Sequence, residues 1–307
     1  MKPQVLFGYD RTFTQPIVWI TFLVMIAFHL GAVAALFMFS WKPFLLAVFL
    51  GWLAGGFGIG MGYHRLLTHR GYKTSKWMEY LLTICATLTL EGGPIFWVAT
   101  HRMHHQNTDK EGDPHSPNDG GLWAHVGWLL TGETKHSGSA ELNPYVPDLR
   151  KDKFHVWISR WHWIPITTLG LLLLIFGGWP YLFWGIFFRT VIGLHSTWLV
   201  NSATHMWGSR RFATSDTSRN SFWVALLTFG EGWHNNHHAH PQSSRHGLAW
   251  YEFDPNWYGI SVLRIFGLAW DVKARSLHQK SEAAVAVHVP DGVNVNQAGD
   301  SRHNQRH

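Results

Sequence analysis

Histidines cluster at three places in this 307-residue chain, in sequences that read HRLLTH at 64–69, HRMHH at 101–105 and HNNHH at 234–238. Together these clusters hold eight of the 22 histidines, and each adjoins an apolar segment. Neutral imidazole is the commonest ligand for borderline transition metals. Eight converging imidazoles are too many for one tetrahedral zinc but suit two adjacent metals. The pattern predicts a membrane-embedded enzyme with a histidine-ligated two-metal site.

The second and third clusters share a spacing that places imidazoles on one helical face. His101, His104 and His105 stand at positions i, i+3 and i+4. The third cluster repeats this spacing with His234, His237 and His238. Because residues three and four apart are neighbours on an α-helix, we expect each cluster to present several nitrogens to a metal pair.

The first cluster does not follow this rule. His64 and His69 are five residues apart, so they do not superpose on one α-helical face. We expect them to converge only if the helix breaks or bends nearby, where glycines at positions 55, 56, 58, 60 and 62 weaken it. A ninth candidate ligand is His205. Asn201, one helical turn earlier, is placed to hold a metal-bound water.

The remaining histidines receive simpler interpretations. His29 and His195 fall inside apolar segments, where we expect each to be a helix–helix hydrogen-bond partner. Isolated histidines in soluble segments are usually surface or capping residues. This interpretation applies to His125, His155, His162, His240 and His246.

Composition points to a lipid bilayer. Hydrophobic residues make up 46% of the chain and charged residues only 14%, and there are 19 tryptophans, which collect at headgroup level in membrane proteins. The single cysteine, Cys85, excludes an internal disulfide and a cysteine-rich metal site. The formal charge of +6 is explained by attraction to anionic lipids, since no basic helix or stacking motif predicts nucleic-acid binding.

Four apolar segments predict transmembrane helices, at about residues 17–39, 43–62, 164–178 and 181–205. The first is long enough to span a hydrocarbon core of about 30 Å. It lacks the short core and small-residue cleavage site of a signal peptide, so we expect it to be retained. Residues 77–98 are also apolar but are interrupted by Glu91, Gly92, Gly93 and Pro94. We expect a helix there that lies along the membrane or dips into it.

The distribution of basic residues predicts the orientation. Segments 1–16, 63–163 and 206–307 would lie on one side of the membrane, and they carry 23 of the 25 Lys and Arg residues. By the positive-inside rule this side is cytoplasmic, and it contains both termini and all three histidine clusters. Of the other two, Lys42 lies in a turn on the opposite side. Arg189 lies within the fourth segment and is either a buried functional charge or a side chain that snorkels to the interface.

We therefore expect an all-α, multi-pass membrane protein whose four transmembrane helices support a cytoplasmic helical cap. The folded domain is predicted to cover residues 1–280. Residues 281–307 lack periodicity and predict a disordered tail, whose histidines are solvated. The membrane would be a bacterial inner membrane, or the endoplasmic reticulum in a eukaryote.

These motifs resemble those of the membrane-bound stearoyl-CoA and acyl-lipid delta-9 fatty acid desaturases. The resemblance covers about residues 15–275 and includes WLVNSATH at 198–205, GDPH at 112–115 and GEGWH at 230–234, besides the three histidine clusters. It implies that nine histidines bind two iron ions and that Asn201 contacts one iron through water. The implied ligands are His64, His69, His101, His104, His105, His205, His234, His237 and His238.

Two departures bear on the carrier of the acyl chain. Animal acyl-CoA desaturases have an Arg–Asp pair directly before the second cluster that helps to hold coenzyme A, whereas this chain has Ala99 and Thr100. The sequence GGPIFW at 92–97 is similar to that of the cyanobacterial and plant branch, some of whose members act on chains esterified in lipids. The carrier, coenzyme A or lipid, stays open at this point.

The resemblance implies a cis double bond, at carbon 9, introduced into a saturated long-chain acyl group with O2 as co-substrate. Electrons are expected from a separate donor, either a ferredoxin or a cytochrome b5 with its reductase. An apolar tunnel would hold the alkyl chain because the cofactor supplies the reactivity while the protein fixes the geometry. Trp97, Trp198 and Trp233 are candidate wall residues, with interface anchoring or packing as the alternative.

Two other functions share some of these features. A membrane di-iron hydroxylase acting on alkanes, sterols or carotenoids has similar histidine clusters, but the longer matches at 201–205 and 230–238 favour desaturation. A metal transporter would place its ligands near the bilayer midplane, whereas these histidines follow the ends of the predicted helices.

Overall fold

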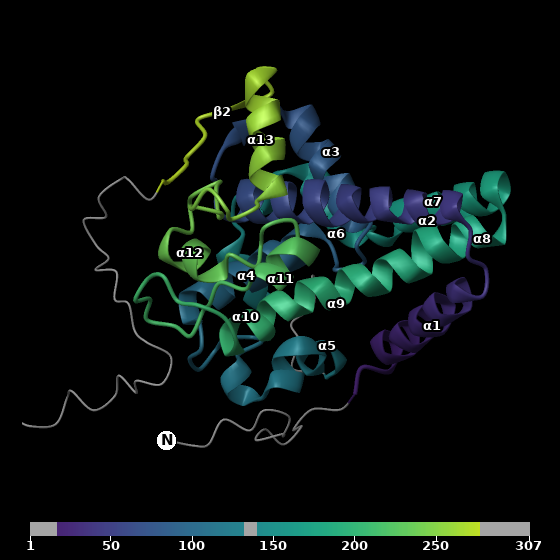
Figure 1. Ribbon diagram of the computed structural model, residues 1–307, viewed down its shortest axis with the longest axis horizontal. Coiled ribbons are helices and arrows are strands. Elements are labelled where there is room, and N and C mark those ends of the chain that lie inside the picture. The colour runs from purple at the N-terminus through teal and green to yellow at the C-terminus, as the bar shows by residue number, and fades with distance from the viewer. Residues whose placement is uncertain (1–16, 132–139, 277–307) are drawn as a thin grey trace, which may run out of the picture.

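The computed structural model describes residues 17–131 and 140–276, and these fold into a mostly helical protein (Figure 1). The tail predicted at 281–307 lies outside the described residues. An all-α fold was predicted, and the helical character is confirmed. The correction is one small antiparallel pair, β1 (Lys73–Thr74) with β2 (Ala269–Trp270).

Two helices are long and apolar enough to cross a membrane, as was predicted for the first two segments. The first is α1 (Trp19–Leu36). The second runs without interruption through α2 (Trp41–Gly51) and η1 (Trp52–Thr68), and the turns of η1 are π-helical. A third candidate consists of α6 (Lys153–Arg160) and α7 (Trp163–Gly177), which meet at an angle of 61°. The described residues thus hold two or three candidate spans.

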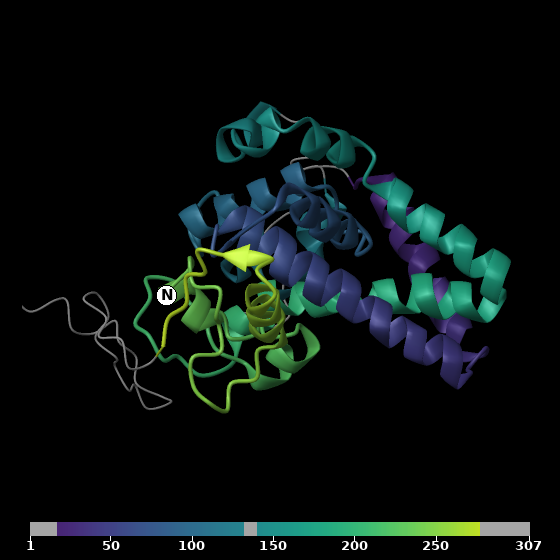
Figure 2. The same cartoon turned by 90° about the horizontal axis from the view of Figure 1, so that it is seen from above.

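The fourth predicted segment forms one continuous helix that is not among these candidate spans. It comprises α8 (Trp179–Leu182), η6 (Phe183–Phe188) and α9 (Arg189–Asn201). In both ribbon views it lies beside α7, α1 and α2 at one end of the molecule (Figures 1 and 2). Large apolar side chains of α1 and α7, such as Leu30 and Phe176, are exposed on the outside of this bundle, as expected for surfaces that face lipid.

The other end of the molecule is a cap of shorter elements. The predicted apolar helix at 77–98 is in fact two helices, α3 (Lys76–Thr87) and α4 (Pro94–Asn107), because the turn at 88–93 separates them. The remaining elements of the cap are η2 (Pro117–Asp119), η3 (Trp123–Gly127), α5 (Trp128–Leu130), η4 (Ala140–Tyr145), η5 (Leu149–Lys151), α10 (Ala203–Met206), α11 (Phe222–Leu227), α12 (His234–Ala239) and α13 (Pro255–Ile265).

The main hydrophobic core lies where η1 packs against α3, α4 and α13. Tyr63, Leu82, Val98 and Ile260 are fully buried there. The glycines of η1 were expected only to weaken the helix. Gly58 instead permits close packing, since a Cβ at this position would lie 2.6 Å from Cα of Ala86 on α3. Close contact between η1 and α3 therefore holds the first histidine cluster against the cap.

Substituting Gly58 tests this packing. Gly58→Ala is expected to lower the free energy of unfolding by about 1–3 kcal/mol, because the added methyl group collides with backbone rather than with a movable side chain. The measurement is the midpoint of thermal unfolding in detergent. Gly193→Ala on α9 is the control, since its Cβ would meet nothing within 4 Å, and it should leave the midpoint unchanged or slightly raised. Equal midpoints for the two variants would contradict the packing argument.

Arg189 does not snorkel to the interface. Only 5% of it is exposed, and its guanidinium donates to the backbone oxygens of Leu88 at 2.6 Å and Gly185 at 3.0 Å. Of the two predicted alternatives, burial is confirmed and snorkelling is wrong, because the turn at 88–93 packs against η6 and α9 and offers a carbonyl acceptor inside the protein. Arg189 joins this turn to the fourth predicted segment.

Candidate metal centre

The structure brings all nine predicted ligands into two groups at the junction of the helical bundle and the cap. Within each group the ligand nitrogens lie within 4.8 Å of one another. The five-histidine group consists of His64, His69, His101, His105 and His237. The four-histidine group consists of His104, His205, His234 and His238.

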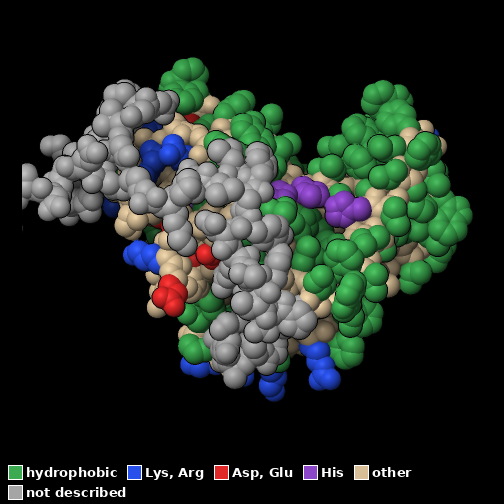
Figure 3. All heavy atoms as spheres, turned by 90° about the horizontal axis from the view of Figure 1, so that it is seen from below, with side chains coloured by type: hydrophobic (Ala, Val, Ile, Leu, Met, Phe, Trp, Pro, Cys, Tyr) green, Lys and Arg blue, Asp and Glu red, His purple; other side chains and the backbone are tan. Residues whose placement is uncertain are grey.

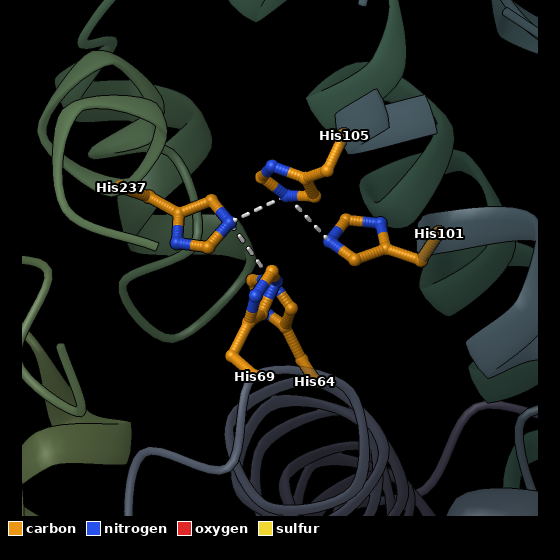
Figure 4. Close-up of side chains that lie close together, drawn as sticks. All are labelled: His64, His69, His101, His105 and His237. Carbon is orange, nitrogen blue, oxygen red and sulfur yellow. Dashed lines mark hydrogen bonds between the residues drawn. The ribbon is translucent and has the colours of Figure 1, made fainter. Parts of the chain in front are cut away.

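Figure 4 shows the five-histidine group, whose rings point toward a common centre from η1, α4 and α12. Nε2 of His237 lies 3.1 Å from Nε2 of His64 and 2.9 Å from Nε2 of His105. Nε2 of His105 lies 3.1 Å from Nε2 of His101. Such close approach of ring nitrogens from different elements is the arrangement that a shared metal ion requires.

The first cluster converges by a route that differs from the prediction. His64 and His69 were expected to meet only through a broken or bent helix, yet the helix that carries His64 is continuous and ends at Thr68, directly before His69. Its last turn is π-helical, and N–H of His69 donates to the backbone oxygen of His64, five residues earlier, at 3.1 Å. A π-turn places residues five apart above one another, so the two ring centroids lie 4.8 Å apart. π-Helical turns are frequent at functional sites.

The second and third clusters each contribute to both groups. On α4, His101 and His105 join the five-histidine group while His104 joins the other. The third cluster on α12 does the reverse, since His237 joins the five-histidine group while His234 and His238 join the other. Nε2 of His234 lies 3.0 Å from Nε2 of His205 on α10. Helices α4 and α12 thus each supply ligands to both groups.

The protonation states fit metal binding. Burial, reinforced by neighbouring imidazoles, holds the pKa values of His101, His105 and His237 well below the usual range. These rings are therefore neutral at pH 7 and can coordinate a cation. Several buried ring nitrogens have no hydrogen-bond partner in the structure, among them Nε2 of His69, His104 and His238. Buried polar atoms without partners are costly, and metal ions at the two centres would engage them.

Four carboxylates contact Nδ1 of ligand histidines, on the side of the ring away from Nε2. Asp113 accepts from Nδ1 of His104 at 2.9 Å, and Asp216 accepts from Nδ1 of His238 at 3.0 Å. The other two are Glu231, 2.6 Å from Nδ1 of His64, and Asp109, 3.4 Å from Nδ1 of His205. A carboxylate at Nδ1 fixes the tautomer and leaves Nε2 free for the metal.

These carboxylates were not predicted to be site residues. Asp113 and Glu231 lie inside the quoted sequences at 112–115 and 230–234, so a signal for them was present. Asp109 and Asp216 had no comparable signal, because they reach the site only through the folding of their loops. Three of the four carboxylates serve the four-histidine group, so the two groups differ in electrostatic environment.

Arg65 joins the first cluster to Glu231, three residues before the third cluster, and to Asp254. Its guanidinium is fully buried and lies 2.9 Å from Oε1 of Glu231 and 2.9 Å from Asp254. Asn256 also donates to Oε1 of Glu231, at 2.7 Å. Since Glu231 holds His64, this network fixes a ligand of the five-histidine group by contacts that reach three separate segments.

Not all of the remaining histidines lie where they were predicted. His29 and His195 do hydrogen-bond between helices, with their Nε2 atoms 3.0 Å apart, so that prediction is confirmed. His246 and His155 are not surface residues, since each is 1% exposed. His246 lies 3.2 Å from Glu231, and His155 lies 3.6 Å from both Glu79 and Asp152. Carboxylates that are distant in sequence account for the difference.

Two cavities meet at the five-histidine group. The first, of about 240 Å³, runs between α2, η1 and α9, and its apolar lining reaches His64 and His101; we call it the tunnel cavity. The second, of about 460 Å³, extends from His101 toward α1 and α5; we call it the side cavity. Both are lined by Asn201 and Trp97, and the Trp97 ring stacks on His101 at a centroid distance of 5.1 Å.

The three tryptophans named from the sequence occupy different places. Trp97 lines both cavities and Trp198 lines the side cavity. Trp233 is buried away from these two linings and donates to the backbone oxygen of Phe253 at 2.9 Å.

Glu91 lies at the junction of the two cavities. From the sequence it was predicted only to interrupt an apolar segment. It accepts from Nε1 of Trp97 and from the hydroxyl of Thr197, each at 2.9 Å. Burial raises the pKa of Glu91 to about 7. This carboxyl group therefore fixes side chains on both walls at the point where the cavities meet.

Comparison with known proteins gives a consistent result. The sequence profile of the fatty acid desaturases matches residues 39–261. The sn-1 stearoyl-lipid 9-desaturase of Anabaena variabilis is 46% identical over 265 residues, which are 85% of this chain and 96% of that protein. Delta-9 acyl-lipid desaturase 1 of Arabidopsis thaliana is 43% identical over 84% of each chain. The icosanoyl-CoA 5-desaturase of Limnanthes douglasii is 42% identical over 85% of this chain and 73% of that protein.

Proposed function

Because this chain belongs to the fatty acid desaturase family, we propose that it introduces a cis double bond at carbon 9 of a saturated C16 or C18 chain esterified in a membrane lipid. The observation that carries the proposal is an apolar cavity that reaches two imidazoles of the five-histidine group, those of His64 and His101. The net reaction removes two hydrogen atoms from adjacent methylenes and reduces O2 to two waters. It takes up two protons and two electrons from an external donor, a ferredoxin or cytochrome b5.

The two histidine groups would each hold one iron ion. Their all-imidazole donor sets and unpartnered nitrogens fit this cofactor. When bound, the iron pair supplies the reactivity toward O2 and an unactivated C–H bond that no side chain has. The protein contributes the position of the ligands, and the carboxylates behind them keep the rings oriented.

The cavities would hold the alkyl chain so that one carbon pair faces the ligands. The tunnel cavity takes the methyl end, and the side cavity takes the part nearer the carrier. At their junction Glu91 fixes Trp97 and Thr197, so the walls there are rigid. A rigid junction next to His101 would select which carbon pair is presented.

We propose the membrane topology that was predicted from the sequence. Four spans, α1, α2 with η1, α7, and α8 with η6 and α9, would place both termini and the histidine groups in the cytoplasm. The excess of Lys and Arg in the segments on that side supports this orientation. The histidines lie beyond the bundle end rather than at its middle, which favours an enzyme over a transporter.

The carrier distinguishes this proposal from its alternatives. Ala99 and Thr100 carry no charge, and both are buried, since Ala99 is not exposed and Thr100 is 8% exposed. Neither residue can therefore form a charged contact with coenzyme A. We expect membranes containing the enzyme and an electron donor to desaturate stearoyl-lipid while acyl exchange is blocked. Labelled stearoyl-CoA, the comparison substrate, should react at most one-tenth as fast. A factor of about ten is what the absence of one charged contact with the carrier would cost.

Gas chromatography with mass spectrometry measures the product and its double-bond position. Desaturation of the coenzyme A thioester alone would overturn the carrier assignment. A hydroxylated product would overturn the reaction type, and a bond at another carbon would overturn the position.

Asn201 is expected to act through a water molecule rather than as a direct ligand. Asn201→Ala should keep both irons and the fold but lower the rate about 10–100-fold, the usual range for groups that support a ligand. Iron content and the rate under iron-saturating conditions are the measurements. Asn107→Ala, an amide on α4 whose side chain donates to Met103, serves as the control. An Asn201→Ala enzyme with full activity would show that Asn201 has no such role.

A further inference from the structure

The side cavity opens to the outside at the bend where α6 and α7 meet at 61°. Arg160, the last residue of α6, and His162, just before α7, both line this cavity. Arg160 is an exposed residue, so the cavity that it lines reaches the surface there. We call the opening at Arg160 and His162 the side mouth. It adjoins the start of α7, and the cavity behind it is bordered by Thr21 and Met25 of α1, the other candidate span at this place.

The surroundings of the side mouth are typical of a membrane interface. Three tryptophans within three residues of Arg160 are exposed, Trp157 at 49%, Trp161 at 36% and Trp163 at 46%. Tryptophan collects at the headgroup level of membranes. The face of the molecule seen in Figure 3 is largely hydrophobic, with Lys and Arg side chains along its lower edge. We therefore expect the side mouth to lie at the depth of the lipid heads.

Arg160 is available for a ligand. Its guanidinium lies over the ring of Trp161, 5.5 Å from the centroid, and none of the described carboxylates pairs with it. Arg65 and Arg102, by contrast, are each bonded to a carboxylate. A guanidinium binds phosphate through two parallel N–H bonds. Partial burial lowers the pKa of His162, so its neutral ring adds an N–H donor without charge at pH 7.

The other approach to the side cavity is acidic. A third cavity, of about 650 Å³, shares Thr100 and Trp128 with the side cavity; we call it the acidic cavity. Its described lining contains one basic side chain, Lys110, against four carboxylates, those of Asp109, Glu111, Asp113 and Asp119. In the described lining of the side cavity the one Lys or Arg side chain is Arg160. Because like charges repel, an anionic head is favoured at the side mouth and disfavoured in the acidic cavity.

We propose that the side mouth binds the phosphate group of a glycerophospholipid, with Arg160 as the contact residue. The guanidinium donates to the phosphate oxygens, and His162 supplies a further donor. The acyl chain enters sideways from the membrane and runs along the side cavity toward Trp97 and His101. Phospholipids, rather than uncharged glycolipids, are then the preferred carrier. This preference rests on the proposed function, whereas the phosphate site rests on the cavity and its charges.

Competition between two lipids tests the proposal. The full chain and an electron donor are placed in vesicles of dioleoyl-digalactosyldiacylglycerol. These contain equal, small amounts of stearoyl-phosphatidylglycerol and stearoyl-monogalactosyldiacylglycerol with different isotope labels. The unmodified enzyme should desaturate the phospholipid about tenfold faster than the galactolipid, as one charge-assisted contact implies. Arg160→Gln should lower this ratio to about one, and Arg160→Lys should keep most of it, since lysine retains the charge.

Arg264→Gln is the matched control. It removes another exposed arginine, on α13, which belongs to the lining of neither the side cavity nor the tunnel cavity. Its ratio should equal that of the unmodified enzyme. Because the ratio compares two substrates of one enzyme, partial loss of folded protein leaves it unchanged. An unchanged ratio in Arg160→Gln, or an equal fall in Arg160→Gln and Arg264→Gln, would overturn the proposal.

Lipid binding without turnover separates the site from the proposed function. Native mass spectrometry of the full chain measures bound distearoyl-phosphatidylglycerol, whose apparent Kd should rise about tenfold in Arg160→Gln. Coenzyme A, the other phosphate-bearing carrier, should not displace this lipid, and displacement would contradict the lipid assignment. If neither lipid is desaturated while Arg160 still governs binding, the proposed function fails and the site stands. If both lipids are desaturated while Arg160→Gln changes neither the ratio nor the binding, the site fails and the function stands.

Discussion

His237→Ala is expected to abolish desaturation and to leave one iron per chain instead of two. Its Nε2 lies within 3.1 Å of nitrogens from both other segments of the five-histidine group, so no other side chain replaces it. The four-histidine group should keep its iron, because its four ligands are untouched. The loss of rate should exceed the roughly 100-fold upper range for residues that only support a ligand. Elemental analysis and the rate of product formation are the measurements.

Two controls accompany this prediction. His240→Ala removes a histidine at the end of the same helix that belongs to neither group, and it should keep both irons. Cys85→Ser should also keep both, because Cys85 is buried in α3 and belongs to neither histidine group. One iron per chain in the unmodified protein, or iron loss in Cys85→Ser, would show that the two-group assignment is wrong. Zinc in the same sites after overexpression agrees with it, since imidazole binds both metals.

Arg65→Met is expected to destabilise the protein by about 3–5 kcal/mol, because it leaves the carboxylates of Glu231 and Asp254 buried without their cation. Iron binding at the five-histidine group should weaken as well, since Glu231 also holds His64. Thermal unfolding in detergent and iron content per chain are the measurements.

Arg70→Met is the matched control. Arg70 lies five residues further along and pairs with Asp148, but 64% of its side chain is exposed. Exposed ion pairs contribute at most about 1 kcal/mol to stability. The unfolding midpoint of this variant should therefore be close to that of the unmodified protein. Similar unfolding midpoints for Arg65→Met and Arg70→Met would mean that the buried network is not what holds the two clusters together.

The types and spacing of residues were sufficient to identify the candidate ligands. Histidines that follow apolar segments in three short clusters are rare by composition, and the sequence around Asn201 and His205 completed the set. The length and low charge of residues 17–39 and 43–62 likewise predicted two membrane-length helices that the structure contains. Such features are local, so they can be read from neighbouring residues alone.

Tertiary structure decided how the nine histidines are divided. Spacing predicted a shared helical face for His101, His104 and His105, but the elements opposite α4 determine which ring joins which group. The meeting of His64 and His69 depends on a π-helical turn, whose N–H groups reach one residue further back than those of an α-helix. No rule of α-helical spacing contains that geometry.

Contacts between distant segments also decided which polar residues are buried. Arg65 and Glu231 are 166 residues apart, and Asp109 and His205 are 96 apart, so no local pattern relates them. Arg189 is buried because the turn at 88–93 supplies its acceptors. The sequence by itself determined which groups can bind metal and which segments can enter the membrane, since both depend on side-chain chemistry. Only the tertiary structure decided which groups meet, because that depends on the packing of segments far apart in the chain.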